Sequence, residues 1–199
     1  MGAAMIWRGE DLRARKQAQG GFSLLEVLFS MVLLAVGLVS LLGVFGLAMA
    51  ATLTTQQDMI AKQLANQAYE SIVTARNTGQ INWDQIQNVG SVDCPITGTA
   101  TCGIFVTGAQ PIYNAGVDGI YGTTDDAVAG AQTLHEPGPD GIFGTADDVY
   151  ISLAGYQRTI VLTNVDTTLR SITITMQYTT TQAGVTKTYV LNSYLSEYQ

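Results

Sequence analysis

The chain has 199 residues, a formal net charge of −7 and two cysteines, and 47% of its residues are hydrophobic. This length suits one globular domain with an anchor segment. The bases beyond residue 21 are few and scattered, whereas nucleic-acid binding needs a clustered basic face, so the composition argues against a nucleic-acid partner. One pair of cysteines is also too small a set for a structural zinc site, which takes four ligands.

Residues 22–51 form an almost uninterrupted apolar segment in which Glu26 is the only charged residue. About 20 apolar residues suffice to cross a bilayer as a helix, and a helix pairs its own backbone amides inside the hydrocarbon. A carboxylate within a membrane helix costs about 2.5–3.5 kcal/mol on insertion scales. We therefore predict a membrane-spanning helix, and we expect Glu26 to have a partner and a function.

The residues around the start of this segment follow a recognisable pattern. A short basic segment, residues 1–21, ends in Gly21 and is followed by Phe22, with Glu26 four residues further on. This pattern resembles the class III signal of type IV prepilins and of type II secretion pseudopilins. The resemblance implies that a prepilin peptidase cuts after Gly21 and N-methylates Phe22. It also implies a filament in which Glu26 neutralises the new Phe22 amine of a neighbouring subunit.

Two other interpretations of the apolar segment compete with this one. In one, the segment is an ordinary membrane anchor. In the other, it is a conventional secretory signal that is cut before Ala51, after the small residues Ala48 and Ala50. The apolar stretch is longer than the 7–15 residues typical of a secretory signal. The mature N-terminus distinguishes the three: Phe22 for a prepilin, Ala51 for a secreted protein and Met1 for an anchor.

Charge around the apolar segment predicts the topology. The four bases of residues 1–21 precede the span, so the N-terminus should stay in the cytoplasm and the C-terminal part should be exported. We expect the precursor to cross the inner membrane once, with a periplasmic head, and to contact lipid and the assembly machinery. After processing, we expect it in a surface pilus or a periplasmic pseudopilus. In an exported domain, Cys94 and Cys102 are expected to form a disulfide.

Periodicity predicts an α+β fold. Residues 22–78 are expected to form one long helix, because Ile60, Leu64, Ala68 and Ile72 recur at i, i+4 spacing after the apolar segment. This apolar stripe should pack on a sheet.

The head, residues 79–199, begins with an irregular stretch in which residues 81–86 are predicted to form a short helical turn and residues 104–106 a short strand. From residue 150 to 198 apolar and polar residues alternate, which predicts an antiparallel meander with one face on the helix. This order of elements resembles pilins. Residues 156–160 and 189–198 further resemble minor pilins of the pilus-modification type and minor pseudopilins of type II secretion.

An acidic nonapeptide occurs twice in the irregular region. Residues 118–126 recur as residues 140–148, with seven of nine positions identical. Carboxylates, hydroxyls and turned carbonyls suit Ca²⁺, which takes six to eight oxygen ligands. The repeats resemble turns associated with calcium in exported bacterial proteins, although Asp and Gly are also frequent in plain surface turns. By that resemblance, the expected calcium ligands are Asp118, Asp125 and Asp126 in one site and Asp140, Asp147 and Asp148 in the other.

The sequence contains no pattern typical of an enzyme. His135, the sole histidine, is expected to be a solvent-facing loop residue, because no nucleophile signature surrounds it. The predicted function is therefore structural: a minor subunit of a type IV pilus. The alternatives are a minor pseudopilin of type II secretion and a membrane-anchored, calcium-binding adhesive module that does not polymerise.

Overall fold

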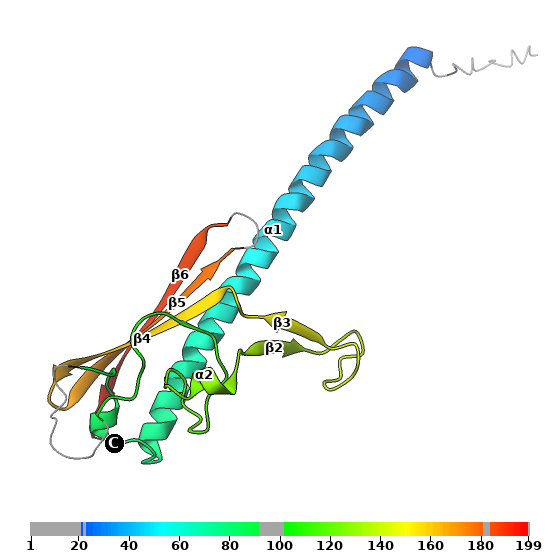
Figure 1. The fold of residues 1–199 in the computed structure, drawn as a ribbon. Coiled ribbons are helices and arrows are strands. Elements are labelled where there is room, and N and C mark those ends of the chain that lie inside the picture. Colours follow the sequence, from blue (N-terminus) through cyan, green and yellow to red (C-terminus); the bar gives the residue numbers. More distant parts are fainter. Residues whose placement is uncertain (1–20, 22, 92–101, 181–183, 199) are drawn as a thin grey trace, which may run out of the picture. The chain divides into compact units, whose positions relative to one another are not determined.

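The computed structural model of the chain describes residues 21, 23–91, 102–180 and 184–198. The chain divides into two compact units, residues 1–47 and 48–199. Figure 1 shows the elements in sequence colours.

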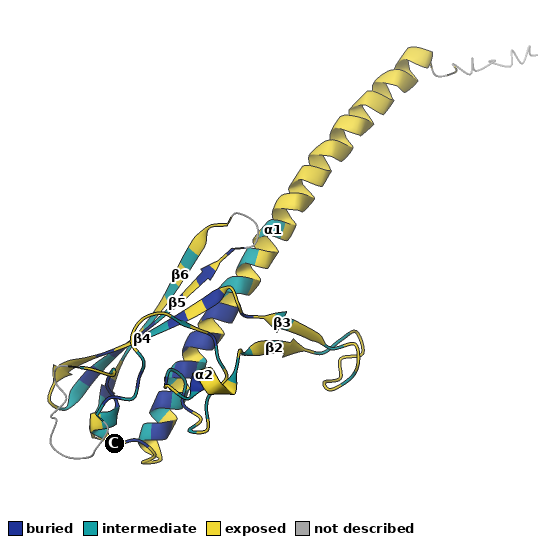
Figure 2. Cartoon of the chain, viewed as in Figure 1, coloured by how far each residue is buried: buried dark blue, intermediate teal, exposed yellow. Residues whose placement is uncertain are grey.

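Helix α1 runs from Leu24 to Asn77, within one or two residues of the predicted bounds. In the N-terminal unit its side chains are exposed all round the helix, as Figure 2 shows. It is the one helix in the described part of the chain that is long and apolar enough to cross a membrane. Beyond this stretch, Thr52, Thr54 and Thr55 donate their hydroxyls to the carbonyls four residues earlier, so their polar groups are satisfied within the helix.

In the C-terminal unit α1 becomes amphipathic, and its apolar stripe is buried. The predicted residues Ile60, Leu64, Ala68 and Ile72 all lie in the core, which confirms the spacing argument. They pack against an antiparallel sheet in the order β1–β4–β5–β6. Its strands are β1 (Gln110–Pro111), β4 (Tyr156–Asp166), β5 (Leu169–Thr179) and β6 (Thr186–Ser196).

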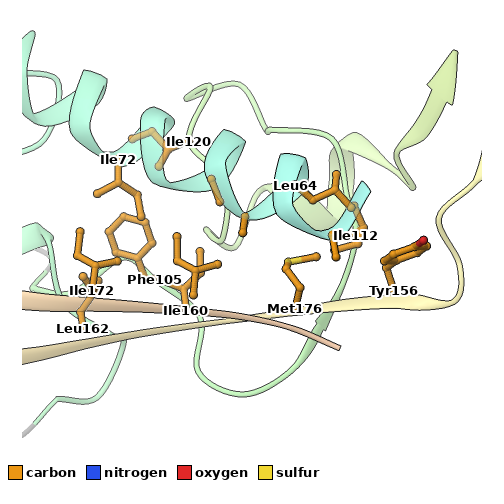
Figure 3. Packing of buried hydrophobic residues seen from close by; sticks show 14 of the residues in the cluster. Leu64, Ile72, Phe105, Ile112, Ile120, Tyr156, Ile160, Leu162, Ile172 and Met176 are labelled. Carbon is orange, nitrogen blue, oxygen red and sulfur yellow. The ribbon is translucent and has the colours of Figure 1, made fainter. Parts of the chain in front are cut away.

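The sheet buries alternate side chains, as the period-two pattern predicts. Ile160 and Leu162 of β4 and Ile172 and Met176 of β5 are buried in the core between sheet and helix (Figure 3). Between them, Val161 is exposed, and Thr173 and Thr175 are half-buried. Phe105 fills the space between helix and sheet. The pilin-like α+β class predicted from the sequence is thus the observed one: a long N-terminal helix packed on a C-terminal antiparallel sheet.

The residues between α1 and β4 differ more from the structure predicted from the sequence. The predicted turn is the 3₁₀ helix η1 (Trp83–Gln85), closed by a capping box in which Asn82 and Gln85 bond reciprocally. Residues 104–106 do not form a strand, because Phe105 makes a single bridge to Asn88 and otherwise serves as a core residue.

Two elements of this region were not predicted from the sequence. They are the short helix α2 (Asp126–Ala129) and a separate hairpin of β2 (Thr133–Glu136) and β3 (Val149–Ser152).

One polar contact ties the helix to the sheet at the start of the packed region. Asp58 of α1 accepts hydrogen bonds from the Tyr178 hydroxyl at 2.5 Å and from Lys187 Nζ at 3.2 Å. The Tyr178 hydrogen bond, followed by Lys187, lowers the pKa of the Asp58 carboxyl below its usual value. A carboxyl whose pKa is lower in the folded state stabilises the protein above its unfolded pKa, and this contribution is lost as the pH falls.

We predict that Asp58→Asn removes a pH-dependent part of the stability. Wild type should be more stable than the variant at pH 6–7, and the difference should shrink as the pH falls below about 4. Chemical unfolding of the detergent-solubilised chain at several pH values measures this difference. Glu70→Gln, on the exposed side of the same helix, is the control. A difference between wild type and Asp58→Asn that stays constant from pH 7 to pH 3 would contradict the assignment.

Candidate functional site

The N-terminal site lies at the first turn of α1. Gly21 is exposed and precedes the helix, and the Ser23 carbonyl accepts the amides of Glu26 and Val27 at 2.9 and 3.2 Å. The Glu26 carboxylate is exposed and has no ion pair or hydrogen bond within the described residues. Phe22, the predicted methylation site, lies outside the described residues.

The first acidic repeat is a compact turn in which donors from the loop hold each carboxylate. Asp118 accepts the Ile120 amide at 2.8 Å. Asp125 accepts the Thr123 hydroxyl at 2.6 Å, and this hydrogen bond lowers the pKa of the Asp125 carboxyl. Carboxylate oxygens of Asp118, Asp125 and Asp126 lie within 4.8 Å of one another, so the three predicted residues can together hold a metal ion.

Asp126 has a structural environment of its own. It is buried, accepts the amides of Gly116 at 3.0 Å and Gly122 at 2.6 Å, and lies 3.7 Å from the buried guanidinium of Arg158. Burial raises the pKa of its carboxyl, against the effect of the two amides and of Arg158. Asp126 thus links the loop to strand β4, whether or not a cation is present.

The second repeat has the same hydrogen bonds at the same positions. Asp140 accepts the Ile142 amide at 2.9 Å, and Asp147 accepts the Thr145 hydroxyl at 2.7 Å. The Thr145 hydrogen bond lowers the pKa of the Asp147 carboxyl. Among the described residues, however, Asp118, Asp125 and Asp126 are the one group of carboxylates close enough to share an ion. The structure therefore supports a metal site in the first repeat, and a site in the second repeat stays a prediction.

In the second repeat a histidine takes the place that Arg158 has in the first. Asp148 accepts the Gly144 amide at 2.6 Å and lies 2.6 Å from His135 Nε2. His135 belongs to strand β2, stacks on Tyr150 at 4.4 Å between ring centroids and meets the edge of Phe143. His135 is exposed, as expected, but the prediction that it lies in a loop was wrong, because it belongs to strand β2 and pairs with Tyr150 of β3.

Comparison with protein families gives one match, over residues 16–42, to the prokaryotic N-terminal methylation motif. The chain carries the N-terminal motif of type IV prepilins and pseudopilins. The match contains Gly21, Phe22 and Glu26, and it confirms the resemblance found in the sequence. No curated protein and no solved structure matches the chain.

One position of each acidic repeat was not predicted from the sequence. Gly116 and Gly138 each precede the repeat's first Asp by two residues, and an added Cβ there would lie 2.1 Å from Asp125 Oδ2 or 2.2 Å from Asp147 Oδ2. The repeat therefore has eleven residues, and glycine is needed because a carboxylate occupies the place of a side chain. Aligning the two repeats from two residues earlier shows this glycine in both copies.

Arg158 was missed as well, although the alternation of β4 contains the clue. It lies two residues from Tyr156 and from Ile160, both inward-facing, so it had to point into the core.

The predicted Cys94–Cys102 disulfide stays a prediction. Cys102 is not a free thiol in the structure, whereas Cys94 lies outside the described residues.

Proposed function

We propose that this chain is an inner-membrane prepilin that is cut after Gly21, methylated on Phe22 and assembled as a minor subunit of a type IV pilus. One observation carries the proposal: the N-terminal methylation motif continues directly into a helix whose apolar part is exposed on every side. Subunits of this family are structural, and the proposal assigns no catalytic residue. Its partners are prepilin peptidase, the inner-membrane assembly machinery, lipid before assembly and other pilins afterwards.

The physical reason for assembly is the exposed apolar surface of residues 24–47. Lipid covers such a surface in the precursor, and outside the bilayer only similar apolar helices can replace lipid. A bundle of these helices from successive subunits buries the apolar surface in place of lipid. We therefore expect each subunit to leave the membrane at the same time as it joins the filament.

Glu26 fixes how neighbouring helices align. Cleavage after Gly21 creates a positively charged amine at Phe22, and the Glu26 carboxylate has no partner within the described residues. At about 4 Å two unit charges attract by roughly 4 kcal/mol at an effective dielectric of 20, before desolvation is subtracted. Because an unpaired charge in an apolar bundle is costly, a subunit shifted along the filament axis is disfavoured.

The same N-terminal motif serves type II secretion pseudopilins, and both systems use the helix in the same way. The two functions differ in where the filament stands: on the cell surface for a pilus, in the periplasm for a pseudopilus. Purified surface filaments that contain this chain by mass spectrometry support the pilus. If the chain is absent from surface filaments and forms oligomers in the periplasm, the result supports a pseudopilin. If the chain stays a monomer in the membrane, the result supports an adhesive module.

We predict that Glu26→Gln and Glu26→Ala leave cleavage intact but reduce incorporation into filaments by tenfold or more. The reason is that the Phe22 amine of a neighbour loses its counter-charge inside the apolar bundle. Immunoblots of sheared filaments, normalised to processed chain in the cell, measure the effect. Ser30→Ala, one turn along the same helix, is the control and should assemble normally. Normal incorporation of both Glu26 variants would refute the pairing role.

We further propose that Ca²⁺ binds the first repeat and stabilises the head. Asp118, Asp125 and Asp126 supply the hard oxygen donors that Ca²⁺ prefers. Asp118 has the most capacity for a cation, because only one of its oxygens accepts a hydrogen bond from the described residues, whereas both oxygens of Asp125 and of Asp126 already do. A bound cation would cancel the repulsion among the three carboxylates and tie residues 118–126 more firmly to the core.

The calcium proposal predicts a cation-dependent melting temperature. Saturating Ca²⁺ should raise the stability of the detergent-solubilised chain by about 2.7 kcal/mol when its concentration is 100 times the Kd. Calorimetry and thermal unfolding, with chelator as reference, measure this effect. Asp118→Asn should abolish the shift that the first repeat provides. Asp140→Asn, the matched change in the second repeat, should retain it. No heat on adding Ca²⁺ and no shift with chelator would remove calcium from the account.

A further inference from the structure

Strands β4 and β5 each bury one arginine, and the two arginines differ in their hydrogen bonds. Arg158 is 3% exposed and Arg170 is 4% exposed. Arg170 donates from Nε to Asn164 Oδ1 at 2.6 Å and from Nη1 to the carbonyls of Trp83 and Ile86. The Arg158 side chain donates no hydrogen bond to the described residues, and its Nη1 is buried without a partner. Because buried polar groups are normally hydrogen-bonded, Arg158 is an exception that needs an explanation.

Two groups lie near the Arg158 guanidinium, and neither accepts a hydrogen bond from it. Asp126 Oδ2 lies 3.7 Å from Nη2, which makes an ion pair but exceeds hydrogen-bond distance, and the Tyr121 ring centroid lies 4.9 Å from the guanidinium carbon. Burial lowers the pKa of the Arg158 guanidinium, against the effect of Asp126. The charge of Arg158 is therefore paired, whereas its hydrogen-bond donors are not used by the described residues.

Arg158 also lines a small pocket between β1, α2 and β4. The pocket has a volume of about 210 Å³. One water molecule needs roughly 10–15 Å³, so the pocket has room for a small organic group. Pro111 of β1 and Ala127 of α2 lie on its wall and are exposed, so the pocket opens to the surface of the head.

The other groups on the pocket wall suit an uncharged amide. Val106, Pro111 and Ala127 are apolar and can cover an alkyl group. The hydroxyls of Tyr113 and Thr124 make no hydrogen bond to the described residues. A hydroxyl can accept an amide N–H, and a guanidinium can donate to an amide carbonyl. The wall thus offers a partner for each part of an amide.

Charge around Arg158 disfavours an anion in the same place. Asp126 already pairs with the single positive charge of Arg158, and carboxylate oxygens of Asp118 and Asp125 lie within 4.8 Å of a carboxylate oxygen of Asp126. A carboxylate ligand would enter a negative environment, in which like charges repel. An amide oxygen avoids this repulsion and still supplies the acceptor that the guanidinium lacks.

We propose that this pocket, the Arg158 pocket, binds an uncharged amide group, with the carbonyl oxygen on the Arg158 guanidinium and the alkyl part against Val106 and Pro111. A peptide segment of a partner protein and a small free amide both carry this group. The proposal requires neither filament assembly nor bound calcium, because every group that it uses belongs to the head of a single chain.

NMR of the arginine side chains in the full-length, detergent-solubilised chain tests the site. The probe is N-acetylalanine methylamide, with chelator present so that calcium does not contribute. We expect the Nε–H signal of Arg158 to shift saturably, because the guanidinium gains an acceptor. The Arg170 signal should not shift, because its Nε already donates to Asn164. Arg158→Lys and Arg170→Lys assign the two signals by removing them.

Two substitutions in α2 are a matched pair for the pocket. Ala127→Trp places a large side chain at the pocket wall and should weaken probe binding tenfold or more. Ala129→Trp, also exposed but outside the pocket, should leave binding unchanged. Because both positions are exposed, both variants are expected to fold.

The remaining outcomes decide the site and the class of its ligand. If the Arg158 signal does not shift up to the solubility limit of the probe, or if both arginine signals shift alike, the site is refuted. If acetate shifts the Arg158 signal at lower concentration than the amide does, the assignment of an uncharged ligand is overturned. A probe lengthened by one residue at each end identifies the source: tighter binding supports a peptide of a partner protein, and weaker binding supports a small free amide. Both of these results support an amide site.

Discussion

The apolar half of α1 is the constraint on which the rest of the molecule depends. Its side chains are exposed throughout the N-terminal unit, and no other described segment covers them. Such a surface needs either lipid or copies of itself, since water is a poor solvent for it. The second half of the same helix meets the opposite condition, because the sheet buries its stripe. One helix therefore serves two environments, and the change from all-round to one-sided hydrophobicity near residue 52 marks the boundary.

In the head, polar contacts hold a long loop region that has few apolar residues. Asp126 and Arg158 connect the first repeat to β4, and Arg170 reaches from β5 to the carbonyls of Trp83 and Ile86 at η1. Both arginines are buried on the helix-facing side of the sheet. They contact loop groups that no strand would pair, at the expense of desolvating two guanidinium groups. The sheet thus provides polar attachment points for the loops as well as an apolar wall.

The sequence predicted the elements whose periodicity is regular and missed those set by contacts distant in sequence. Ile60 to Ile72 at helical spacing and the alternation of β4 to β6 depend on short-range pattern, and the structure confirms them. The β2–β3 hairpin was missed because residues 137–148, which contain the second repeat, separate its strands, and this is longer than the roughly two to five residues typical of a hairpin loop. The three aspartates of the first repeat were predicted as a cluster. The different surroundings of Ile120, which is buried, and Ile142, which is exposed, could not be, since identical turns differ only in what folds around them.

The mass of the mature N-terminal peptide tests the central claim most directly. The account requires that the basic leader be removed, because a chain that keeps it has no free amine beside Glu26 in the apolar bundle. Mass spectrometry of the chain from cells that contain prepilin peptidase should find a peptide that begins at Phe22 and carries one methyl group on its amine. A chain that begins at Met1 or at Ala51 in those cells would contradict the account.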